Sequence, residues 1–274
     1  MDDIDRFLQE DLGKQGDITS DSLFTNETAN AIIIAKEKCI IAGLEEAKKV
    51  FKKTGASVDF LVKDGDLIEE KTIVAKINGS ARSILKGERL ALNIIARMSG
   101  VATETKRLSY ICRKINPNIK IAATRKTTPG FRSFEKKAII IGGGEPHRYG
   151  LYDAVLIKDN HLRLIGSIEK AIQKIKENVK NKIIEVEVEN EKDAVIAAKL
   201  NVDVIMLDNF NPRAAEMVAK KIKKINKNIL IEISGGINAK NIIKYASFAD
   251  RISLGYLTHS IKSIDFSLEI LGNI

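Results

Sequence analysis

The sequence has no tryptophan, only two cysteines, and aromatic side chains at only 5% of its 274 positions. Cys39 and Cys112 stand singly in apolar surroundings, so they form neither a disulfide framework nor a metal or redox motif. No apolar run approaches the 18 residues of a membrane span, and the acidic start Met-Asp-Asp-Ile-Asp differs from a signal peptide. These absences predict a protein of the reducing cytoplasm that has no membrane partner.

The sequence is rich in apolar residues and carries an excess of positive charge. Hydrophobic residues make up 44% of the sequence, which is enough for one large domain or two smaller ones. Lysine and arginine outnumber the acidic residues 45 to 36, which gives a formal net charge of +9. Such a surplus is typical of proteins that bind nucleic acid, an acidic membrane surface or a small polyanionic substrate.

The pattern up to about residue 100 predicts a small α+β domain. Short Ile- and Val-rich runs predict strands at 31–35, 39–42, 58–62 and 72–77. Apolar residues at helical spacing predict a helix from Leu44 that Gly55 ends, and a second helix over 85–98 that ends near Gly100.

From about residue 117 the sequence alternates between strand and helix patterns. Apolar runs predict strands at 119–123, 154–157, 183–188, 204–207, 229–233 and 252–254. Amphipathic helices follow over 168–179, with Ser167 as N-cap, and over 215–225, with Asn211 as cap and Pro212 at the first helical position. Alternation of this kind predicts a parallel α/β sheet or barrel.

Polar side chains come directly after these strands. They are Thr124-Arg125-Lys126, Lys158, Asp208-Asn209, Ser234-Gly235-Gly236 and Gly255, while the strand at 183–188 itself carries Glu185 and Glu187 and is followed by Glu189. In a β/α barrel the strand ends converge on one rim, where catalytic groups gather. We therefore predict an active site there.

Two of these segments suit anions. Ser234-Gly235-Gly236 is followed by an expected helix capped by Asn238, and small residues beside a helix N-terminus favour phosphate, although a plain tight turn would have the same sequence. Arg125 can hold a carboxylate with two hydrogen bonds and Lys126 supplies a point charge, although a solvated basic loop would also contain them. His147-Arg148 follows the flexible Gly142-Gly143-Gly144.

Glu187 and Asp208 lie at neighbouring strand ends. Such a pair can bind sugar hydroxyls, help to place Mg²⁺ or stabilise an oxocarbenium ion, or it can simply neutralise nearby cations. The sequence contains no His/Cys metal cluster and no inferable Ser–His–Asp set. The lysines between 220 and 227 fall on the polar face of a helix without interleaved aromatic residues, which argues against nucleic acid.

Longer motifs extend over nearly the whole chain. They are Glu-Asp-Leu…Gly-Asp-Ile-Thr-Ser (10–20), Glu-Arg-Leu-Ala-Leu-Asn…Met-Ser-Gly-Val-Ala-Thr (88–103), Thr-Arg-Lys-Thr-Thr-Pro-Gly (124–130), Gly-Gly-Gly-Glu-Pro-His-Arg (142–148), Gly-Leu-Tyr-Asp-Ala-Val-Leu-Ile-Lys-Asp-Asn-His (150–161), Glu-Val-Glu-Val-Glu-Asn (185–190), Ile-Met-Leu-Asp-Asn-Phe (205–210), Ile-Ser-Gly-Gly-Ile (233–237) and Leu-Thr-His-Ser (257–260). In order and spacing they closely resemble the quinolinate phosphoribosyltransferase family.

The resemblance implies a pentosyltransferase that joins quinolinate to phosphoribosyl pyrophosphate and releases pyrophosphate and carbon dioxide in NAD biosynthesis. It implies an α/β sandwich N-terminal domain over 1–103, on which the tail 267–274 packs, followed by an incomplete, TIM-like β/α barrel over 104–266. It further implies a homodimer, or a higher oligomer, with shared active sites. The implied partners are small anionic substrates and Mg²⁺, without an organic cofactor.

The resemblance also assigns roles by motif. Arg125, His147, Arg148 and Lys158 would hold the quinolinate carboxylates, and Arg89 would reach in from the neighbouring subunit. Lys126 would meet the pyrophosphate, and Glu187 and Asp208 would bind the ribose hydroxyls near Mg²⁺. The 5′-phosphate would be bound by Ser234, Gly235, Gly236, Gly255 and His259. Lys126, Lys158, Glu187 and Asp208 are the expected catalytic residues.

One residue departs from the family pattern, because Pro146 stands where an asparagine is usual and removes a backbone donor and a side-chain amide. Two other functions compete with this assignment. A paralogous protein of molybdate transport loci is similar to this family, but Lys158 favours the quinolinate enzyme. A basic nucleic-acid-binding module would need clustered surface cations with aromatic residues, whereas these cations follow strands.

Overall fold

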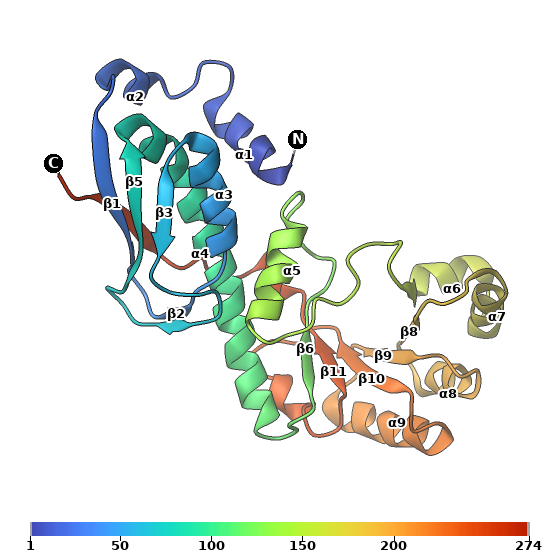
Figure 1. Cartoon of the computed structure of the whole chain (residues 1–274). Coiled ribbons are helices and arrows are strands. Elements are labelled where there is room, and N and C mark those ends of the chain that lie inside the picture. The colour runs from blue at the N-terminus through green and yellow to red at the C-terminus, as the bar shows by residue number, and fades with distance from the viewer. Residues whose placement is uncertain (1, 273–274) are drawn as a thin grey trace. The chain divides into compact units, whose positions relative to one another are not determined.

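The computed structural model describes residues 2–272 and divides the chain into two compact units (Figure 1). The first unit comprises the described residues of Met1–Lys106, Thr128–Gly143 and Ser260–Ile274, and the second comprises Arg107–Thr127 and Gly144–His259. Residues 128–143 and 260–266, which we placed in the barrel domain, thus belong to the first unit. Residues 273 and 274 of the predicted tail lie outside the described residues.

The first unit contains a four-stranded antiparallel sheet in the order β12-β1-β5-β3. Its strands are β1 (Thr28–Ala35), β3 (Ser57–Phe60), β5 (Ile73–Ser80) and β12 (Phe266–Ile270). A two-stranded sheet is formed by β2 (Cys39–Ile40) and β4 (Leu67–Ile68). Because β12 pairs with β1 from Ala35 opposite Phe266 to Ala31 opposite Ile270, the end of the chain completes this sheet.

Helices accompany this sheet. They are α1 (Asp3–Leu12), α2 (Ile18–Leu23), α3 (Leu44–Thr54), α5 (Arg132–Ile141) and the first part of α4 (Ala81–Arg113). As predicted, α3 begins at Leu44 and ends at Gly55, whose left-handed φ of 94° closes the helix. Glu45 and Glu46 in its first turn and Lys52 and Lys53 in its last turn complement the helix dipole.

The predicted end of α4 near Gly100 is wrong, because the helix continues to Arg113. Gly100 lies inside the helix at a close backbone contact, and a Cβ atom there would lie 2.3 Å from the carbonyl oxygen of Lys262. The glycine thus serves packing within the first unit and does not end the helix. The predicted domain boundary after residue 103 falls within α4 as well.

The second unit is built on a parallel sheet, which has six strands among the described residues, in the order β6-β11-β10-β9-β8-β7. Its strands confirm the predicted ones and are β6 (Lys120–Ala122), β7 (Val155–Ile157), β8 (Ile184–Val188), β9 (Val204–Asp208), β10 (Leu230–Ser234) and β11 (Arg251–Ser253). The strands β6 and β7 remain at the two edges, so the barrel is incomplete, as expected.

The connecting helices of this unit are α6 (Asp159–Ile165), α7 (Ile168–Asn178), α8 (Glu191–Lys199), α9 (Pro212–Ile225) and α10 (Tyr256–His259). Figure 1 shows α7, α8 and α9 side by side along β8, β9 and β10. The predicted caps Ser167 and Asn211 are confirmed, because their side chains accept hydrogen bonds from the Lys170 and Ala214 amides. Among the described helices, none is long and apolar enough to span a membrane.

The α-helix expected after Ser234-Gly235-Gly236 is wrong. Only a 3₁₀ turn forms there, η1 (Ile242–Lys244). The side chain of Asn241 accepts a hydrogen bond from the Asn238 amide and donates one to the carbonyl of Gly236. The Asn241 side chain thus bonds backbone groups that would otherwise form the hydrogen bonds of a helix. Because no α-helix forms here, a helix dipole does not contribute to anion binding at this point.

The close contact at Gly100 leads to a prediction. We expect Gly100→Ala to lower the free energy of unfolding by about 1–3 kcal/mol, because its new methyl group would collide with the Lys262 carbonyl. Alanine ordinarily stabilises a helix interior by about 1 kcal/mol relative to glycine, so the sign of the change is diagnostic. Urea unfolding measures it, with exposed Lys106→Ala on the same helix as the control. A more stable Gly100→Ala protein would contradict this account.

Candidate active site

A cavity of about 770 Å³ opens at the carboxyl ends of the strands of the second unit. Its lining includes every residue that we predicted for the site except Arg89: Arg125, Lys126, His147, Arg148, Lys158, Glu187, Asp208, Ser234, Gly235, Gly236, Gly255 and His259. Its volume lies in the usual range for small-molecule sites. The sequence therefore located the cavity correctly, by way of the residues that follow the strands.

The inner face of the sheet carries two layers of polar side chains. Alternate residues of a strand face the same side, so Glu185 and Glu187 of β8 point inward together, as do Glu232 and Ser234 of β10. The upper layer, at the strand ends, contains Lys158, Glu187, Asp208 and Ser234. The lower layer contains Glu185, Glu232 and Arg251, and its two glutamates are buried.

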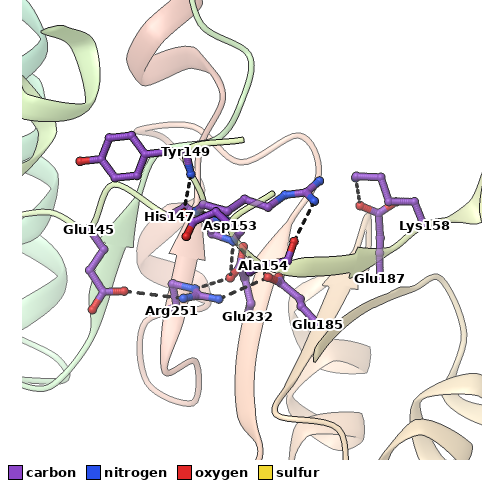
Figure 2. Close-up of polar contacts among 11 residues, drawn as sticks. Glu145, His147, Tyr149, Asp153, Ala154, Lys158, Glu185, Glu187, Glu232 and Arg251 are labelled. Carbon is purple, nitrogen blue, oxygen red and sulfur yellow. Dashed lines mark hydrogen bonds and ion pairs between the residues drawn. The ribbon is translucent and has the colours of Figure 1, made fainter. Parts of the chain in front are cut away.

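The upper layer pairs charges at the mouth of the cavity. Lys158 Nζ forms an ion pair with Glu187 Oε2, which Figure 2 shows. Asn209 Nδ2 donates a hydrogen bond of 2.6 Å to Asp208 Oδ2, and Asn209 has a left-handed φ of 58°. The carboxylates thus lie beside groups that a polar ligand could replace.

Two glycines allow backbone to come close to this mouth. Gly235 has φ 82°, and a Cβ atom there would lie 2.4 Å from Asn209 Oδ1. At Gly255 a Cβ atom would lie 2.9 Å from Lys126 Cδ and 3.2 Å from His259 Nε2. Lys126 and His259 therefore converge beside an open backbone segment, an arrangement suited to phosphate oxygens.

Two arginines lie half-buried in the same cavity. Burial lowers the pKa of the Arg148 guanidinium, and the positive charge of Arg125 lowers it further. The buried Nε of Arg125 has no hydrogen-bond partner among the described residues. Because guanidinium groups stay charged and prefer planar oxyanions, this pair of like charges could bind a carboxylate.

His147 occupies a different environment from the one we predicted. Its φ is 55° and its side chain is only 7% exposed. Nε2 lies 3.3 Å from Glu185 Oε2 and 3.4 Å from Glu232 Oε2, while Nδ1 accepts a hydrogen bond of 2.8 Å from the Arg148 amide. The ring thus lies beside buried carboxylates and also lines the cavity, and the contact with a substrate carboxylate that the family resemblance assigns to it stays a prediction.

The lower layer compensates its own charges (Figure 2). Arg251 Nε forms an ion pair with Glu232 Oε2, and Arg251 Nη2 lies 3.6 Å from Glu185 Oε2. Burial raises the pKa of Glu185, and the charge of Glu232 raises it further. Burial alone would raise the pKa of Glu232 too, but His147 and Arg251 outweigh burial and lower it.

Sequence reasoning missed Glu232 and Arg251. Glu232 lies within an apolar run and Arg251 directly before one, and each stands two positions before the serine, Ser234 or Ser253, that ends its strand. The alternation of side chains along a strand places such a residue on the same face as the strand end. A charged residue two positions before the end of a predicted strand was therefore the signal in the sequence that could have identified Glu232 and Arg251.

Arg89 is the predicted residue that does not line the cavity. It lies on α4 in the first unit, its side chain is 65% exposed, and its guanidinium is 3.8 Å from Glu88.

Two sets of oxygen donors could hold a cation. Glu187 and Asp208 offer carboxylate oxygens at the mouth, of the kind that Mg²⁺ prefers. The potential ligand atoms of His147, Glu185 and Glu232 also lie within 4.8 Å of one another. The guanidinium of Arg251 already neutralises this second set, which makes it a poor metal site.

Two family models together match most of the chain. The description "Quinolinate phosphoribosyl transferase, N-terminal domain" matches residues 17–99, and "Quinolinate phosphoribosyl transferase, C-terminal domain" matches residues 101–269.

Individual relatives agree with the family models. A protein of Archaeoglobus fulgidus named "Probable nicotinate-nucleotide pyrophosphorylase [carboxylating]" is 42% identical over 93% of this chain and 98% of its own length. The rat "Nicotinate-nucleotide pyrophosphorylase [carboxylating]" is 36% identical over 88% of this chain and 82% of its own. The solved structure of the nicotinate-nucleotide pyrophosphorylase from Francisella tularensis superposes with a TM-score of 0.90 at 36% identity, covering 97% of this chain and 94% of that one. These matches lend no support to the molybdate-locus or nucleic-acid alternatives.

The environment of His147 leads to a pH prediction. Burial alone would lower the pKa of the ring, but Glu185 and Glu232 outweigh burial and raise it to about 9. The stability from the charged ring is therefore fully present below pH 6.5, the pKa in an unfolded chain, and is lost as the pH rises through 9. We expect the stability advantage of the wild type over His147→Gln to shrink by about 3 kcal/mol between pH 6 and pH 10, measured by urea unfolding.

Burial raises the pKa values of Cys39 and Cys112 to about 12 and about 11, so these thiols also make stability depend on pH. Their contribution is the same in the wild type and in His147→Gln, and it cancels when the two free energies of unfolding are subtracted. The hydrogen bond from the Arg148 amide to Nδ1 acts in the opposite direction, since it needs an unprotonated nitrogen. A difference in stability that stays constant across this pH range would mean that His147 is neutral in the folded protein.

Proposed function

The chain belongs to the quinolinate phosphoribosyltransferase family, and from this premise we propose that it joins quinolinate to phosphoribosyl pyrophosphate. The products are nicotinate mononucleotide, pyrophosphate and carbon dioxide, in NAD biosynthesis. The observation that carries the proposal is the half-buried pair Arg125 and Arg148, which face one cavity together with the backbone at Gly235 and Gly255. One cavity thus offers a carboxylate site and a phosphate site.

The two carboxylates of quinolinate suit the cations on one side of the cavity. Among residues 2–272, the buried Nε–H of Arg125 finds no acceptor, and Arg148 lies close enough for the two charges to repel each other. A dicarboxylate would relieve that repulsion and accept these donors. Lys158 would supply a third cation by exchanging its contact with Glu187 for one with the substrate.

Phosphoribosyl pyrophosphate suits the opposite side. Ser234, Gly235, Gly236 and Gly255 offer backbone and hydroxyl donors to the 5′-phosphate, with His259 beside them. Lys126 would meet the pyrophosphate. Glu187 and Asp208 would bind the ribose hydroxyls.

The chemistry follows from this placement. The pyridine nitrogen attacks the anomeric carbon of the ribose, and the bond to pyrophosphate breaks with its electron pair leaving on oxygen. Carboxylates near the sugar stabilise the positive charge that develops there, and Lys126 stabilises the leaving group. The alkylated, positively charged ring then accepts the electrons of the carbon–carboxylate bond as carbon dioxide leaves, and a proton from solvent takes its place. Holding two anionic substrates in contact is the main task of the protein.

Mg²⁺ fits the donors at the mouth of the cavity. Asp208 and Glu187 would hold it together with the pyrophosphate oxygens, since Mg²⁺ is commonly bound through one or two carboxylates plus substrate phosphates. When bound, it supplies positive charge that neutralises the departing pyrophosphate. The proposed reaction needs no organic cofactor.

The proposed assembly is a homodimer with shared sites. Arg89 is exposed and lies outside the cavity of its own chain, so it is available to a neighbouring subunit. We also propose a cytoplasmic location, which the free and buried Cys39 and Cys112 support because thiols persist in reducing compartments.

A direct assay tests the function. Purified protein supplied with quinolinate, phosphoribosyl pyrophosphate and Mg²⁺ should release carbon dioxide and form nicotinate mononucleotide in equal amounts, measured by trapped label and by chromatography. The control replaces quinolinate with nicotinate, which has only one carboxylate for the two arginines. Turnover of nicotinate without turnover of quinolinate would refute the substrate assignment.

Mixing two inactive variants tests the shared site. We expect Arg89→Ala and Lys126→Ala each to lower kcat/KM by about a hundredfold or more, since each removes a charged contact to substrate. After the two are mixed and allowed to exchange subunits, half of the dimers are mixed and each has one intact site. Activity should recover to about a quarter of the wild-type value. Full activity of Arg89→Ala alone, or no recovery on mixing, would refute its role in the partner's site.

A further inference from the structure

The open side of the barrel is lined by the short segment 144–148. The Glu145 amide donates to the Ile121 carbonyl at 2.8 Å, and its carbonyl accepts from Ala123 at 3.0 Å, so the segment extends the sheet beyond the edge strand β6. Further along, Arg148 Nη1 donates to the carbonyl of Ala154, which precedes the other edge strand β7. The segment thus contacts both edges of the incomplete barrel.

Little apolar packing holds this segment in place. Gly142 and Gly143 precede it, Gly144 begins it, and its residues 144–148 are all only partly buried. What enters the interior is the imidazole of His147, from a backbone conformation that few residues other than glycine adopt. The ring must therefore be held by contacts that outweigh this strain.

Those contacts come from the lower polar layer. Glu185 of β8 and Glu232 of β10 approach the same ring nitrogen, and Arg251 of β11 joins the two carboxylates from the other side. Glu232 has no exposed surface, so water does not screen its charge and the carboxylate interacts mainly with neighbouring side chains. The ring also lies against the backbone of the next residue, with Nδ1 2.8 Å from the Arg148 nitrogen, which connects this layer to the residue that carries the guanidinium.

We propose that Glu232, held by Arg251, is a positioning residue that acts through His147 to fix the 145–148 segment and thereby aims Arg148 at the substrate carboxylate. This inference rests on the proposed function, because the expected substrate of Arg148 is a dicarboxylate. In this proposal the role of His147 is to hold the backbone segment that carries Arg148.

Kinetics and binding of the Glu232→Gln protein test this role. We expect the KM for quinolinate to rise about tenfold or more, while the KM for phosphoribosyl pyrophosphate stays within about twofold, because only the carboxylate side of the site loses its support. Calorimetric binding of quinolinate without the phosphoribosyl donor should weaken by the same factor. The control is Glu216→Gln, which removes a carboxylate that pairs with Lys220 on the exposed face of α9, and should leave both KM values unchanged.

A double-mutant cycle separates positioning from a general structural defect. If Glu232 acts through His147, then His147→Asn and the double variant His147→Asn with Glu232→Gln should have the same KM for quinolinate. Asparagine tolerates the left-handed backbone but is too short to reach the carboxylates. Additive effects of the two changes, or equal increases in both KM values, would overturn the proposal.

Hydrogen exchange gives a readout that is independent of the reaction. The amides of Glu145, His147 and Arg148 should exchange faster in Glu232→Gln than in the wild type, and at the wild-type rate in Glu216→Gln. If Glu232→Gln does not fold, Arg251→Lys, which keeps the charge but loses the planar fork, should show the same acceleration to a smaller degree. Unchanged exchange in Glu232→Gln would overturn the inference. Faster exchange in this variant, together with a wild-type protein that does not bind quinolinate, would instead refute the proposed function.

Discussion

The ion pair between Arg251 and Glu232 allows charged side chains to be buried in the interior of the barrel. Burying a carboxylate in an apolar core is costly unless a cation and hydrogen bonds compensate it, and here two carboxylates are buried on neighbouring inward positions. Arg251 compensates both, and the remaining negative charge attracts His147. The position of His147 in turn determines where the next residue, Arg148, can go. A contact at the base of the barrel is thus coupled to the mouth of the cavity, within a single unit of the chain.

The positive charge of the chain divides into two kinds. Arg125, Lys126 and Arg148 are gathered in one cavity, where Arg125 and Arg148 repel each other. Glu185 and Glu187 offset part of this repulsion, and a bound anion would offset more of it. The lysines of α9 instead find partners on the surface, since Lys220 pairs with Glu216 and Lys221 with Glu191. Surface pairs of this sort contribute little, so the net charge alone says little about function. The position of each cation relative to the strand ends is what carries the information.

Much of the second unit could be predicted because its strands follow a simple rule. Doubly buried strands appear as short apolar runs, and the residue after each run lies at the rim, which is why Lys158, Asp208 and Ser234 could be assigned to one cavity before any coordinates. Gly100 was misinterpreted because a glycine that ends a helix and a glycine that admits a neighbouring backbone look the same in one sequence. The turn after Gly236 was mistaken for a helix because asparagine side chains that cap a helix can also replace it. Glu232 and Arg251 were overlooked because their roles depend on strand neighbours that are distant in the chain.

The segment at 145 has a further effect on how the protein behaves in solution. An unpaired edge of a parallel sheet is a template on which another chain can add a strand, and exposed edges of this kind promote aggregation. Glu145 occupies hydrogen-bonding positions along β6, and Pro146 after it offers no amide while favouring the extended conformation that Glu145 needs. The proline that departs from the family pattern therefore ends the added strand after a single residue. In this way the short loop whose His147 and Arg148 line the cavity also covers an edge of the sheet, and weakening its anchor would expose that edge and reduce solubility.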